Sequence, residues 1–468
     1  MELLSRGEGM MDSPLGASGN AGAMAGVSDS LRQKGIPPVI TTDGPSGIRL
    51  RATCSLLPSG TALACSWNLP LVQDLYAAMG REMVDKGTDV LLAPGMNIHR
   101  NPLCGRNFEY FSEDPLVTGK LAAAVVQGLQ SAPVSACPKH FACNNQEYNR
   151  NYNNSVVSAR ALREIYLRGF EICVKEAHPK NLMTSYNKIN GVWSHYNYQL
   201  CTALLREEWG FDGVLISDYS ALAELIVHGV AEDEEQAAKL AMEAGVDMDM
   251  VSRVYAEALT RLIGEGKLQE EFLDEAVLRI LRLKDKLGLF ENPYRYSDEQ
   301  IEEEQACIGG KEHRDLARTI AEESFVLLKN EGVLPIRPEK KQRIALIGPY
   351  ADVRDLCGSW SIYRREEDGI SLKEAMENCY GAEFVESAQG SFLLDEEEVF
   401  YSFRSKELTG KGERNEAGRT DEELLAEAMK TAKKADVIVV AIGEHQQKSG
   451  EGSTKSSLAL PKCQIELL

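Results

Sequence analysis

The stretch "GFDGVLISDYSALAE", residues 210–224, joins a short apolar strand to a carboxylate and then to the start of a helix. Residues 214–216 are all aliphatic, which is typical of a buried parallel strand. Two interpretations of Asp218, which follows this strand, are open. It could cap the helix that begins near residue 221, or it could lie at the mouth of a barrel, where parallel strands end in functional loops.

The theme of this stretch, an apolar strand followed by a polar loop and an amphipathic helix, recurs over the first 290 residues. Such alternation predicts parallel strands joined by crossover helices. Over this length a (β/α)8 barrel of the TIM type is the natural closed form. The expected strands are 38–41, 90–93, 134–137, 182–185, 214–217 and 246–250, and the clearest helices are 71–84 and 158–178.

A second α/β domain is expected in the last third of the chain. Its strands, at 344–347 and 437–442, are apolar on both faces, as in a sheet covered by helices, and a helix near 316–328 precedes them. Few strands precede Leu468, so the pattern indicates a sandwich that is incomplete at its C-terminus. We therefore divide the chain into a barrel domain, a linker and a partial α/β sandwich domain, at residues 1–295, 296–320 and 321–468.

The formal net charge of −20 argues against two classes of partner. An acidic surface repels phosphate backbones and anionic lipid, so we expect neither nucleic acid nor a membrane as a partner. The sequence has no apolar run of about 18 residues and no basic-then-apolar N-terminus, which predicts a cytoplasmic location. The sequence makes no prediction of oligomeric state.

The eleven cysteines are scattered singly and form no C-x-x-C pair. This pattern indicates reduced, mostly buried thiols rather than a zinc ribbon or a disulfide framework. An alternative is that Cys137 binds a metal together with His140 or Cys143. We expect no metal and no cofactor.

Five successive expected strands end in polar or charged residues at corresponding positions. The loops after parallel barrel strands lie on one face, so these side chains should converge. Such a set suits a polyhydroxylated ligand, because each sugar hydroxyl needs both a donor and an acceptor. The residues are Asp43 after the first strand, Arg106 in the loop after the second, Lys139 and His140 after the third, Tyr186 and Asn187 after the fourth, and Asp218 after the fifth.

Each of these residues also has a structural interpretation. Asp43 precedes Gly-Pro and could simply form a turn. Arg106 lies close in sequence to Glu109 and other acidic residues, and could be an ion-pair partner. Lys139 and His140 could be buried for structural reasons. The convergence of the other strand ends favours a site over a helix cap for the carboxylate after the fifth strand.

The loop "GEHQQKSGEGSTKSSLALP", residues 443–461, follows the last expected strand. It is rich in glycine but fits neither G-x-x-x-x-G-K-[ST] nor G-x-G-x-x-G, so it is not a phosphate loop. It offers two carboxylates, Glu444 and Glu451. The alternative is a solvated loop with ordinary surface charges.

Seven motifs in this order resemble glycoside hydrolase family 3, the β-glucosidase-like enzymes. They are "DGPSGIR", "GRNFEYFSEDP", "KHFACNN", "TSYNKING", "GVLISDYSA", "ESFVLLKN" and "SGEGS…LALP". The resemblance extends from about Ile36 to Leu467. It implies a (β/α)8 barrel followed by an α/β sandwich, and hydrolysis of β-linked sugars from the non-reducing end with retention of configuration.

The resemblance also implies residue roles. Asp218 matches the family's nucleophile, and Glu451 matches its acid/base, with Glu444 as the alternative. In such a retaining site the nucleophile is ionised and the acid/base is protonated. We expect positive charge near Asp218 to keep it ionised, supplied by Arg106, Lys139 and His140. The residues expected to contact the substrate are Asp43, Arg106, Lys139, His140, Met183, Tyr186 and Tyr219, the last standing where the family usually has tryptophan.

The function implied is that of a retaining exo-β-glycosidase acting on an oligosaccharide or β-glucoside, and a β-glucosidase is favoured. Two alternatives are open. One is a β-xylosidase of the same family, because no motif reports the room left for a C6 hydroxymethyl group. The other is a sugar-binding homologue without catalysis, which would need the barrel contacts but not the second carboxylate.

Overall fold

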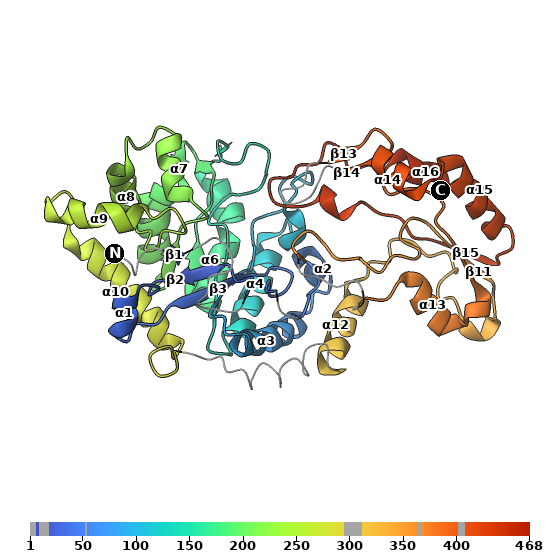
Figure 1. The fold of residues 1–468 in the computed structure, drawn as a ribbon, viewed down its shortest axis with the longest axis horizontal. Helices are drawn as coiled ribbons and strands as arrows, with labels where there is room; N and C mark the ends of the chain where they lie inside the picture. Colours follow the sequence, from blue (N-terminus) through green and yellow to red (C-terminus); the bar gives the residue numbers. More distant parts are fainter. Residues whose placement is uncertain are drawn as a thin grey trace. The chain divides into compact units, whose positions relative to one another are not determined.

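The computed structural model describes residues 6–8, 18–51, 54–293, 311–362, 367, 369–400 and 408–468. The chain forms two compact units (Figure 1). The barrel unit contains Met1–Pro102 and Arg106–Phe325, and the sandwich unit contains Leu103–Gly105 and Val326–Leu468. Residues 296–310 of the expected linker lie outside the described residues.

The described strands of the barrel unit include five that overlap the expected strands 38–41, 90–93, 134–137, 182–185 and 214–217, together with five that were not expected. They are β1 (Arg6–Glu8), β2 (Gly22–Met24), β3 (Val39–Asp43), β4 (Val90–Leu92), β5 (Ser135–Ala136), β6 (Asn154–Ser155), β7 (Asn181–Met183), β8 (Lys188–Ile189), β9 (Val192–Trp193) and β10 (Val214–Ile216).

The parallel strands are neighbours in space in the order of the chain. β3, β4 and β5 pair in parallel, and β7 pairs in parallel with β10. A parallel bridge from Phe141 to Thr184 links these two groups, and another from Ile216 to Met248 adds the segment expected as a strand at 246–250. This order, with helices between the strands, confirms the α/β class and the TIM-like barrel.

The start of the barrel differs from an all-parallel sheet. β2 runs antiparallel to β3, and β1 runs antiparallel to β2. The connection from β2 to β3 contains only the short helix α1 (Asp29–Gln33). A short connection of this kind reverses the direction of the chain, as in a hairpin, whereas two parallel strands must be joined by a longer segment.

Alternate residues of the strands face two different cores. On β4, Leu91 packs with the helices of one cluster, while Val90 and Leu92 belong to a second cluster that includes Met183 and Val214 from other strands. This division follows from the period of two along a strand. Strands buried on both faces explain the continuous apolar runs in the sequence.

Helices cover the barrel strands. They are α1, α2 (Gly60–Cys65), α3 (Leu69–Asp85), α4 (Pro115–Leu129), α5 (Ala159–Ala161), α6 (Arg168–Ala177), α7 (Ala221–Val227), α8 (Glu234–Glu243), α9 (Val254–Gly264), α10 (Glu270–Lys286) and α12 (Lys311–Ser324), with 3-10 turns η2 (Asn107–Glu109) and η4 (Ser194–Tyr196) and π-helical segments η3 (Leu162–Tyr166) and η5 (Gln199–Glu208).

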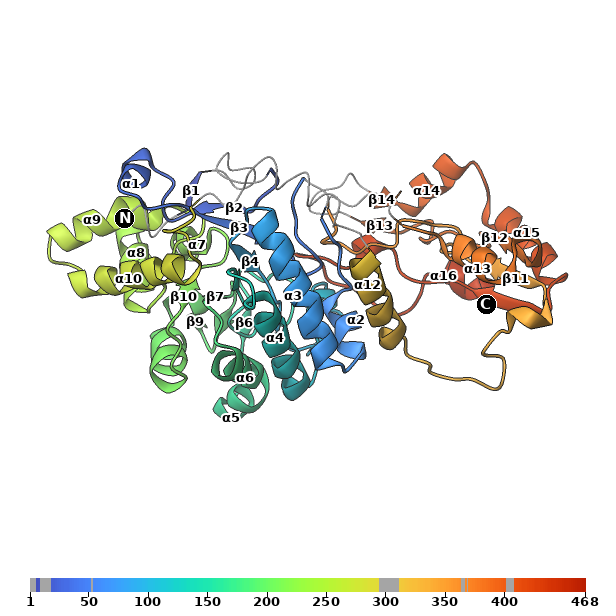
Figure 2. The ribbon, with the colours of Figure 1, turned by 90° about the horizontal axis from the view of Figure 1, so that it is seen from below.

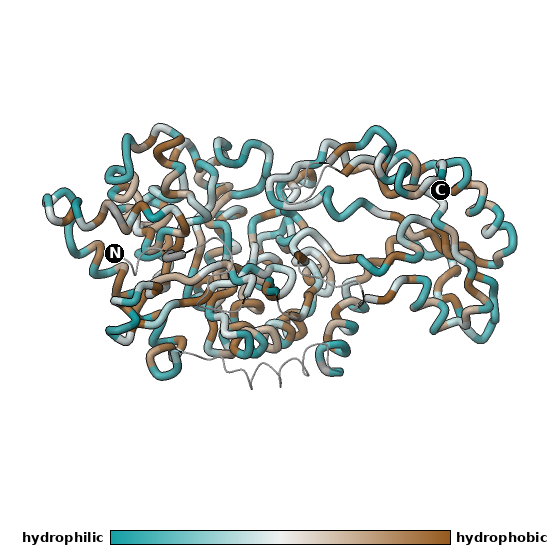
Figure 3. Tube along the Cα trace, viewed as in Figure 1, coloured by the Kyte–Doolittle hydropathy of each residue, from teal (hydrophilic) through white to brown (hydrophobic). Residues whose placement is uncertain are grey.

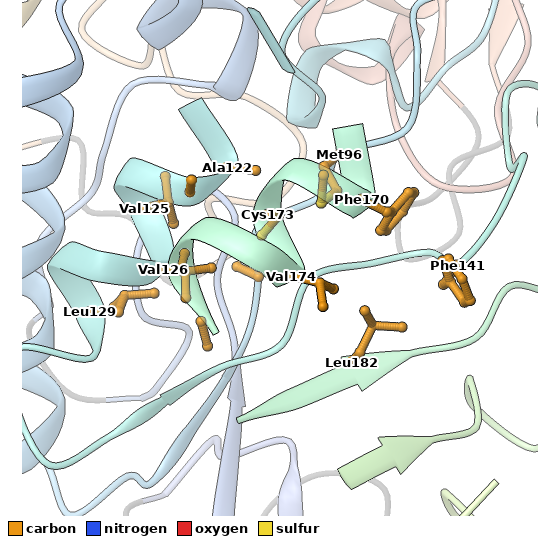
Figure 4. Close-up of a cluster of buried hydrophobic side chains, with 14 of the residues drawn as sticks. Met96, Ala122, Val125, Val126, Leu129, Phe141, Phe170, Cys173, Val174 and Leu182 are labelled. Atoms are coloured by element: carbon orange, nitrogen blue, oxygen red, sulfur yellow. The ribbon is translucent and has the colours of Figure 1, made fainter. Parts of the chain in front are cut away.

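The helices α3, α4 and α6 form a packed layer on one side of the barrel (Figure 2). Figure 4 shows side chains of α4 and α6, among them Val126 and Val174, in one buried cluster with Leu182 and Phe141 of the barrel. Phe141 also meets Phe170 edge to face, with ring centroids 5.2 Å apart. This core fixes the strand whose end carries His140.

The helix expected over 158–178 is not continuous. It is divided into α5, the π-helical η3 and α6. A π turn adds a residue to the helical repeat and so rotates the residues that follow. In this register Phe170, Cys173 and Val174 of α6 are buried.

The helix expected at 316–328 ends earlier, at Ser324, and lies within the barrel unit. Its Leu316 and Ile320 pack against the core of that unit, beside α2 and α3. Residues 325–328 are apolar but exposed, and they form no helix. The helix therefore ends where its apolar face stops finding a partner.

The sandwich unit contains the second α/β sheet that the sequence predicts. Its strand order is β12-β11-β15, all parallel. Its elements are η6 (Pro338–Lys340), β11 (Ile344–Ile347), α13 (Leu372–Tyr380), η8 (Ala382–Phe384), β12 (Val385–Ala388), β13 (Val399–Phe400), β14 (Leu408–Thr409), α14 (Gly410–Ala417), α15 (Asp421–Ala432), β15 (Val437–Val440), η9 (Gln446–Lys448) and α16 (Lys462–Leu467).

The central strand of this sheet is covered on both faces. Ile344 and Leu346 of β11 pack toward Met376 of α13, whereas Ala345 packs toward Ala428 of α15. Figure 3 shows the apolar colour concentrated along these strands. The edge strand β15 is less covered, and Ile438 is 52% exposed.

The described cysteines are all free thiols, and half of them are buried. The buried ones include Cys137 and Cys201, and burial raises the pKa of each to about 12. Cys379 on α13 is exposed.

Candidate active site

The carboxyl ends of neighbouring barrel strands bring the expected residues to one end of the barrel unit. Asp43 ends β3, Lys139 and His140 follow β5, Tyr186 follows β7, and Asp218 follows β10. Because β3, β4, β5, β7 and β10 are neighbours in parallel order, their ends lie at the same rim.

Asp218 is fixed by the backbone on both sides of it. Its Oδ1 accepts a hydrogen bond of 2.7 Å from the amide of Tyr219, and the preceding Ser217 amide donates to the Met248 carbonyl at 2.9 Å. Helix α7 begins at Ala221, with Ser220 as its N-cap residue. Asp218 is therefore not the N-cap of this helix, and the capping interpretation of its carboxylate is wrong.

His140 lies against Asp218, with 3.9 Å between its Nε2 and the carboxylate Oδ2. It is buried, and its backbone exchanges two hydrogen bonds of 2.9 Å with the side chain of Asn97. Its Nδ1 lies 3.3 Å from the hydroxyl of Tyr110. These contacts fix the imidazole beside the carboxylate.

The imidazole of His140 does not supply the positive charge that we expected from the sequence. Burial holds its pKa well below the ordinary value, and the nearby cations Arg106, Lys139 and Arg150 lower it further. His140 is therefore neutral at physiological pH and adds no charge of its own beside Asp218. The positive potential comes from the arginine and lysine side chains.

Arg106 forms an ion pair, which was the structural interpretation of this residue that the sequence left open. Its Nε donates to Glu109 Oε1 at 2.5 Å, and both side chains are almost completely buried. The ion pair fixes the guanidinium plane while its positive charge still acts on His140. The ion-pair role therefore does not exclude a role in the site.

Asp43 lies between two cations. One carboxylate oxygen forms an ion pair with Arg49, and the other lies 3.9 Å from Lys139 Nζ. The carboxylate is thus oriented by charged partners, which a simple turn former would not require. Arg49 was missed from the sequence, although it lies in the motif "DGPSGIR" together with Asp43.

Arg150 is a second residue that the sequence analysis missed. Its guanidinium lies 4.7 Å above the ring of Tyr186, and its NH1 donates to Glu147 at 3.1 Å. Tyr186 in turn donates from its hydroxyl to the carbonyl of Tyr219 at 2.7 Å. Arg150 follows the motif "KHFACNN" by five residues, so it lies in the loop of the same strand end.

Glu224 on α7 is a third missed residue. Its pKa is raised to about 7, mainly by burial and then by the charge of Asp218, while Arg150 opposes the shift. It follows Asp218 by six positions, and the charge of Asp218 acts on it from the strand end that precedes the helix. The sequence "SALAE" gave no sign of this beyond helical spacing.

Met183 lies on β7 and is buried in the cluster that includes Val214 and Ile216. Its contact with substrate stays a prediction. Tyr219 is partly buried. Its backbone amide donates to Asp218 and its carbonyl accepts from Tyr186, whereas the sequence suggested a role for its aromatic side chain.

The two candidate acid/base residues belong to the sandwich unit. Glu444 follows β15 and forms an ion pair with Lys455, while its carbonyl accepts from the hydroxyl of Tyr350 at 2.7 Å. Glu451 lies further along the same loop and is partly buried. The ion pair gives Glu444 a structural role.

The described residues contain no group of three or more His, Cys, Asp or Glu side chains placed to hold a metal ion. In particular, Cys137 and Cys143 do not combine with His140 in this way. Among the same residues, no helix is both long and apolar enough to cross a lipid bilayer.

Two family models match the chain. The glycosyl hydrolase family 3 N-terminal domain matches residues 18–283, and the glycosyl hydrolase family 3 C-terminal domain matches residues 325–468. The chain belongs to glycosyl hydrolase family 3. The family resemblance that the motifs indicated is thus confirmed, and so is the TIM-like barrel followed by an α/β sandwich, which structures of this family share.

Individual proteins are similar over most of the chain. Thermostable beta-glucosidase B of Acetivibrio thermocellus is 37% identical over 455 residues, which cover 94% of this chain and 54% of that protein. An exo-alpha-(1->6)-L-arabinopyranosidase of Bifidobacterium longum is 33% identical, over 97% of this chain and 56% of that protein.

A solved structure is similar as well. The structure of a mutant beta-glucosidase from Listeria innocua in complex with laminaribiose has a TM-score of 0.80 and 33% identity, over 92% of this chain and 56% of that one. This chain spans about half the length of the family members that it matches.

Proposed function

We propose that this chain carries the site of a retaining exo-β-glycosidase, and that a terminal β-linked glucose is the favoured glycone. The arrangement around Asp218 carries the proposal, because a carboxylate at a barrel rim faces a neutral imidazole within a group of fixed cations. Membership of family 3 and similarity to proteins named β-glucosidases add support.

In the first step, a carboxylate oxygen of Asp218 attacks the anomeric carbon and the bond to the leaving oxygen breaks. Glu451 gives its proton to that oxygen, so the aglycone leaves as a neutral alcohol. The positive charges of Arg106 and Lys139 keep Asp218 ionised before the attack. The sugar is then joined to Asp218 as an ester.

In the second step, Glu451 accepts a proton from water, and the resulting hydroxide attacks the anomeric carbon from the face that the aglycone left. The ester bond to Asp218 breaks and sugar with retained configuration is released. Both steps use side chains of the chain alone. Glu444 is the alternative to Glu451, and its carboxylate already forms an ion pair with Lys455.

The barrel rim offers partners for the hydroxyl groups of the glycone. Asp43 accepts hydrogen bonds, Lys139 donates them, and the neutral imidazole of His140 can do either. Arg106, Met183, Tyr186 and Tyr219 complete the set of sequence-predicted contacts, and we add Arg49 and Arg150 as candidates. A donor and an acceptor for each hydroxyl would favour a pyranose over an apolar ligand.

The choice of glycone is open between a hexose and a pentose. The family 3 relative from Bifidobacterium longum is named for arabinopyranose, a pentose without a C6 hydroxymethyl group. This favours keeping pentopyranosides, including the expected β-xyloside, as a second candidate. A sugar-binding protein without catalysis is the third, and the cytoplasmic location stays a prediction.

The test is release of 4-nitrophenol from its β-glucoside, β-xyloside and α-L-arabinopyranoside. We expect the wild type to act on at least one, with the ratio of kcat/KM values identifying the glycone. Asp218→Asn should be inactive. Glu451→Ala should be slow and should be rescued by azide, which attacks the glycosyl-enzyme and gives a β-glycosyl azide.

The controls separate the candidates. Glu444→Ala should retain activity if Glu451 is the acid/base, and azide rescue of Glu444→Ala instead would reverse that assignment. A wild type that releases no 4-nitrophenol but binds glucose by calorimetry would support the binding protein. A product of inverted configuration, followed by NMR, would disprove the retaining mechanism.

A further inference from the structure

Two neighbouring residues of one loop contact the helix that follows Asp218. Asn151 donates from its Nδ2 to Glu224 Oε1 at 3.1 Å. Tyr152 meets the ring of His228 edge to face, with ring centroids 5.1 Å apart. Both belong to the segment 147–153, which we call the 147–153 loop.

The two contacts lie on the same side of the helix. Glu224 and His228 are four residues apart, at α7 and its C-cap, and residues with this spacing are neighbours on a helix surface. His228 is itself fixed, because it stacks on Trp193 with centroids 3.8 Å apart and nearly parallel planes. The helix therefore presents two prepared attachment points to the loop.

The same loop also contacts the candidate site. Its Arg150 lies over the ring of Tyr186, and the hydroxyl of Tyr186 donates to the carbonyl of Tyr219, next to Asp218. The contacts thus form a closed ring. It runs from Asp218 along α7 to Glu224, across to Asn151 and Arg150, and back through Tyr186.

We propose that Glu224 is a positioning residue, which through Asn151 fastens the 147–153 loop to α7 and so keeps Arg150 over Tyr186 beside Asp218. This inference rests on the proposed function and adds to it a residue that acts through others. None of the sequence motifs assigned it a role.

The surroundings of Glu224 indicate that it attaches the loop through a hydrogen bond rather than through an ion pair. Its Oε2 is buried and has no hydrogen-bond partner among the described residues. The charged groups that act on it are Asp218 from the strand end and Arg150 from the loop, and the pKa of about 7 favours the protonated form at lower pH. A protonated carboxyl still accepts from Asn151 through its carbonyl oxygen.

The experiment uses four variants of the full chain. Glu224→Ala removes the acceptor, and Asn151→Ala removes the donor. Glu224→Gln keeps a carbonyl oxygen for Asn151 but cannot ionise. The double variant Asn151→Ala with Glu224→Ala closes a double-mutant cycle, and Glu243→Ala on α8, a partly exposed helical glutamate, is the matched control.

Two readouts are needed. Amide hydrogen exchange of residues 147–153 reports the attachment of the loop without any substrate. KM and kcat on the 4-nitrophenyl glycoside report its effect on the site. We expect Glu224→Ala and Asn151→Ala each to speed amide exchange in the loop and to raise KM by roughly fivefold. We expect kcat to change less, because the substrate and the transition state lose the same binding energy. The double variant should be no worse than either single one.

Glu224→Gln should behave like the wild type in both readouts at pH 6, and Glu243→Ala should change neither. If amide hydrogen exchange of the 147–153 loop is unchanged in Glu224→Ala, the proposed attachment of the loop is wrong, even if the enzyme is active. Additive losses in the double variant, or failure of Glu224→Gln to restore the wild-type values, would also overturn it. An inactive wild type with the expected exchange pattern would disprove the proposed function while still supporting the attachment of the loop.

Discussion

The two units hold their candidate carboxylates in different ways. In the barrel unit, Asp218 ends a buried strand, accepts a backbone amide and is only 10% exposed. In the sandwich unit, Glu444 and Glu451 lie on the loop after β15, and the ion pair of Glu444 with Lys455 is partly exposed. Groups on strand ends are held more precisely than groups on loops. The difference is consistent with the proposed roles, in which the nucleophile stays fixed and the acid/base exchanges protons with water.

The largest expected effect is on catalysis, when the carboxylate at the barrel rim and a carboxylate of the sandwich loop are substituted in turn. Asp218→Asn should lower kcat by roughly 10⁴-fold, because the nucleophile is lost while the amide oxygen can still accept from Tyr219. Glu444→Gln should lower kcat by less than about tenfold. Steady-state kinetics with 4-nitrophenyl glycosides checks both, and a collapse of activity in Glu444→Gln would show that the loop carboxylates have been assigned the wrong way round.

The next effect concerns stability. Glu109→Ala leaves the buried Arg106 without its carboxylate and should lower the free energy of unfolding by about 3–5 kcal/mol. Lys455→Ala breaks the partly exposed pair with Glu444 and should cost less than about 1 kcal/mol. Urea unfolding followed by circular dichroism measures both. Equal losses would contradict the view that the barrel rim is the more tightly built of the two.

The smallest effect concerns pH. Because the folded pKa of Glu224 is raised to about 7, the unfolded chain releases this proton first, and stability should fall as pH rises from about 4.5 to 7. Glu224→Gln removes this loss, so its melting temperature should exceed that of the wild type by about 1–2 °C at pH 7, with no gain at pH 4.5, since partial solvent contact screens the interaction. The exposed Glu427 on α15 provides the control, and Glu427→Gln is measured at the same two pH values.

Much of the fold could be predicted from the sequence because its signals are local. Short, largely apolar runs located β3, β4, β5, β7, β10, β11 and β15, and the rule that sites follow barrel strands led to Asp43 and Asp218. The antiparallel start and the π-helical η3 could not be predicted, because they depend on the length of a connection and on one extra residue in a helix.

The site residues that could not be predicted from the sequence depend on the paths of loops and on the burial of side chains. Arg49, Arg150 and Glu224 reach the site through turns and a helix that no spacing rule encodes. The charge of His140 was predicted wrongly for a related reason: a histidine near a carboxylate suggests an imidazolium, and only the packing around it shows that the ring is too buried to be protonated. The helix-cap alternative for Asp218 could be rejected only once Ser220 was seen at that position.

The free thiols have a practical consequence for spectroscopy. Burial keeps Cys137 and Cys201 protonated at neutral pH, so they should react slowly with maleimides, which need the thiolate. Among the described cysteines, Cys379 on α13 is the exposed one. A fluorescent dye attached there would sit on the sandwich unit and leave every proposed catalytic and binding side chain untouched, so binding of a quencher-labelled sugar could be followed in the unmodified site.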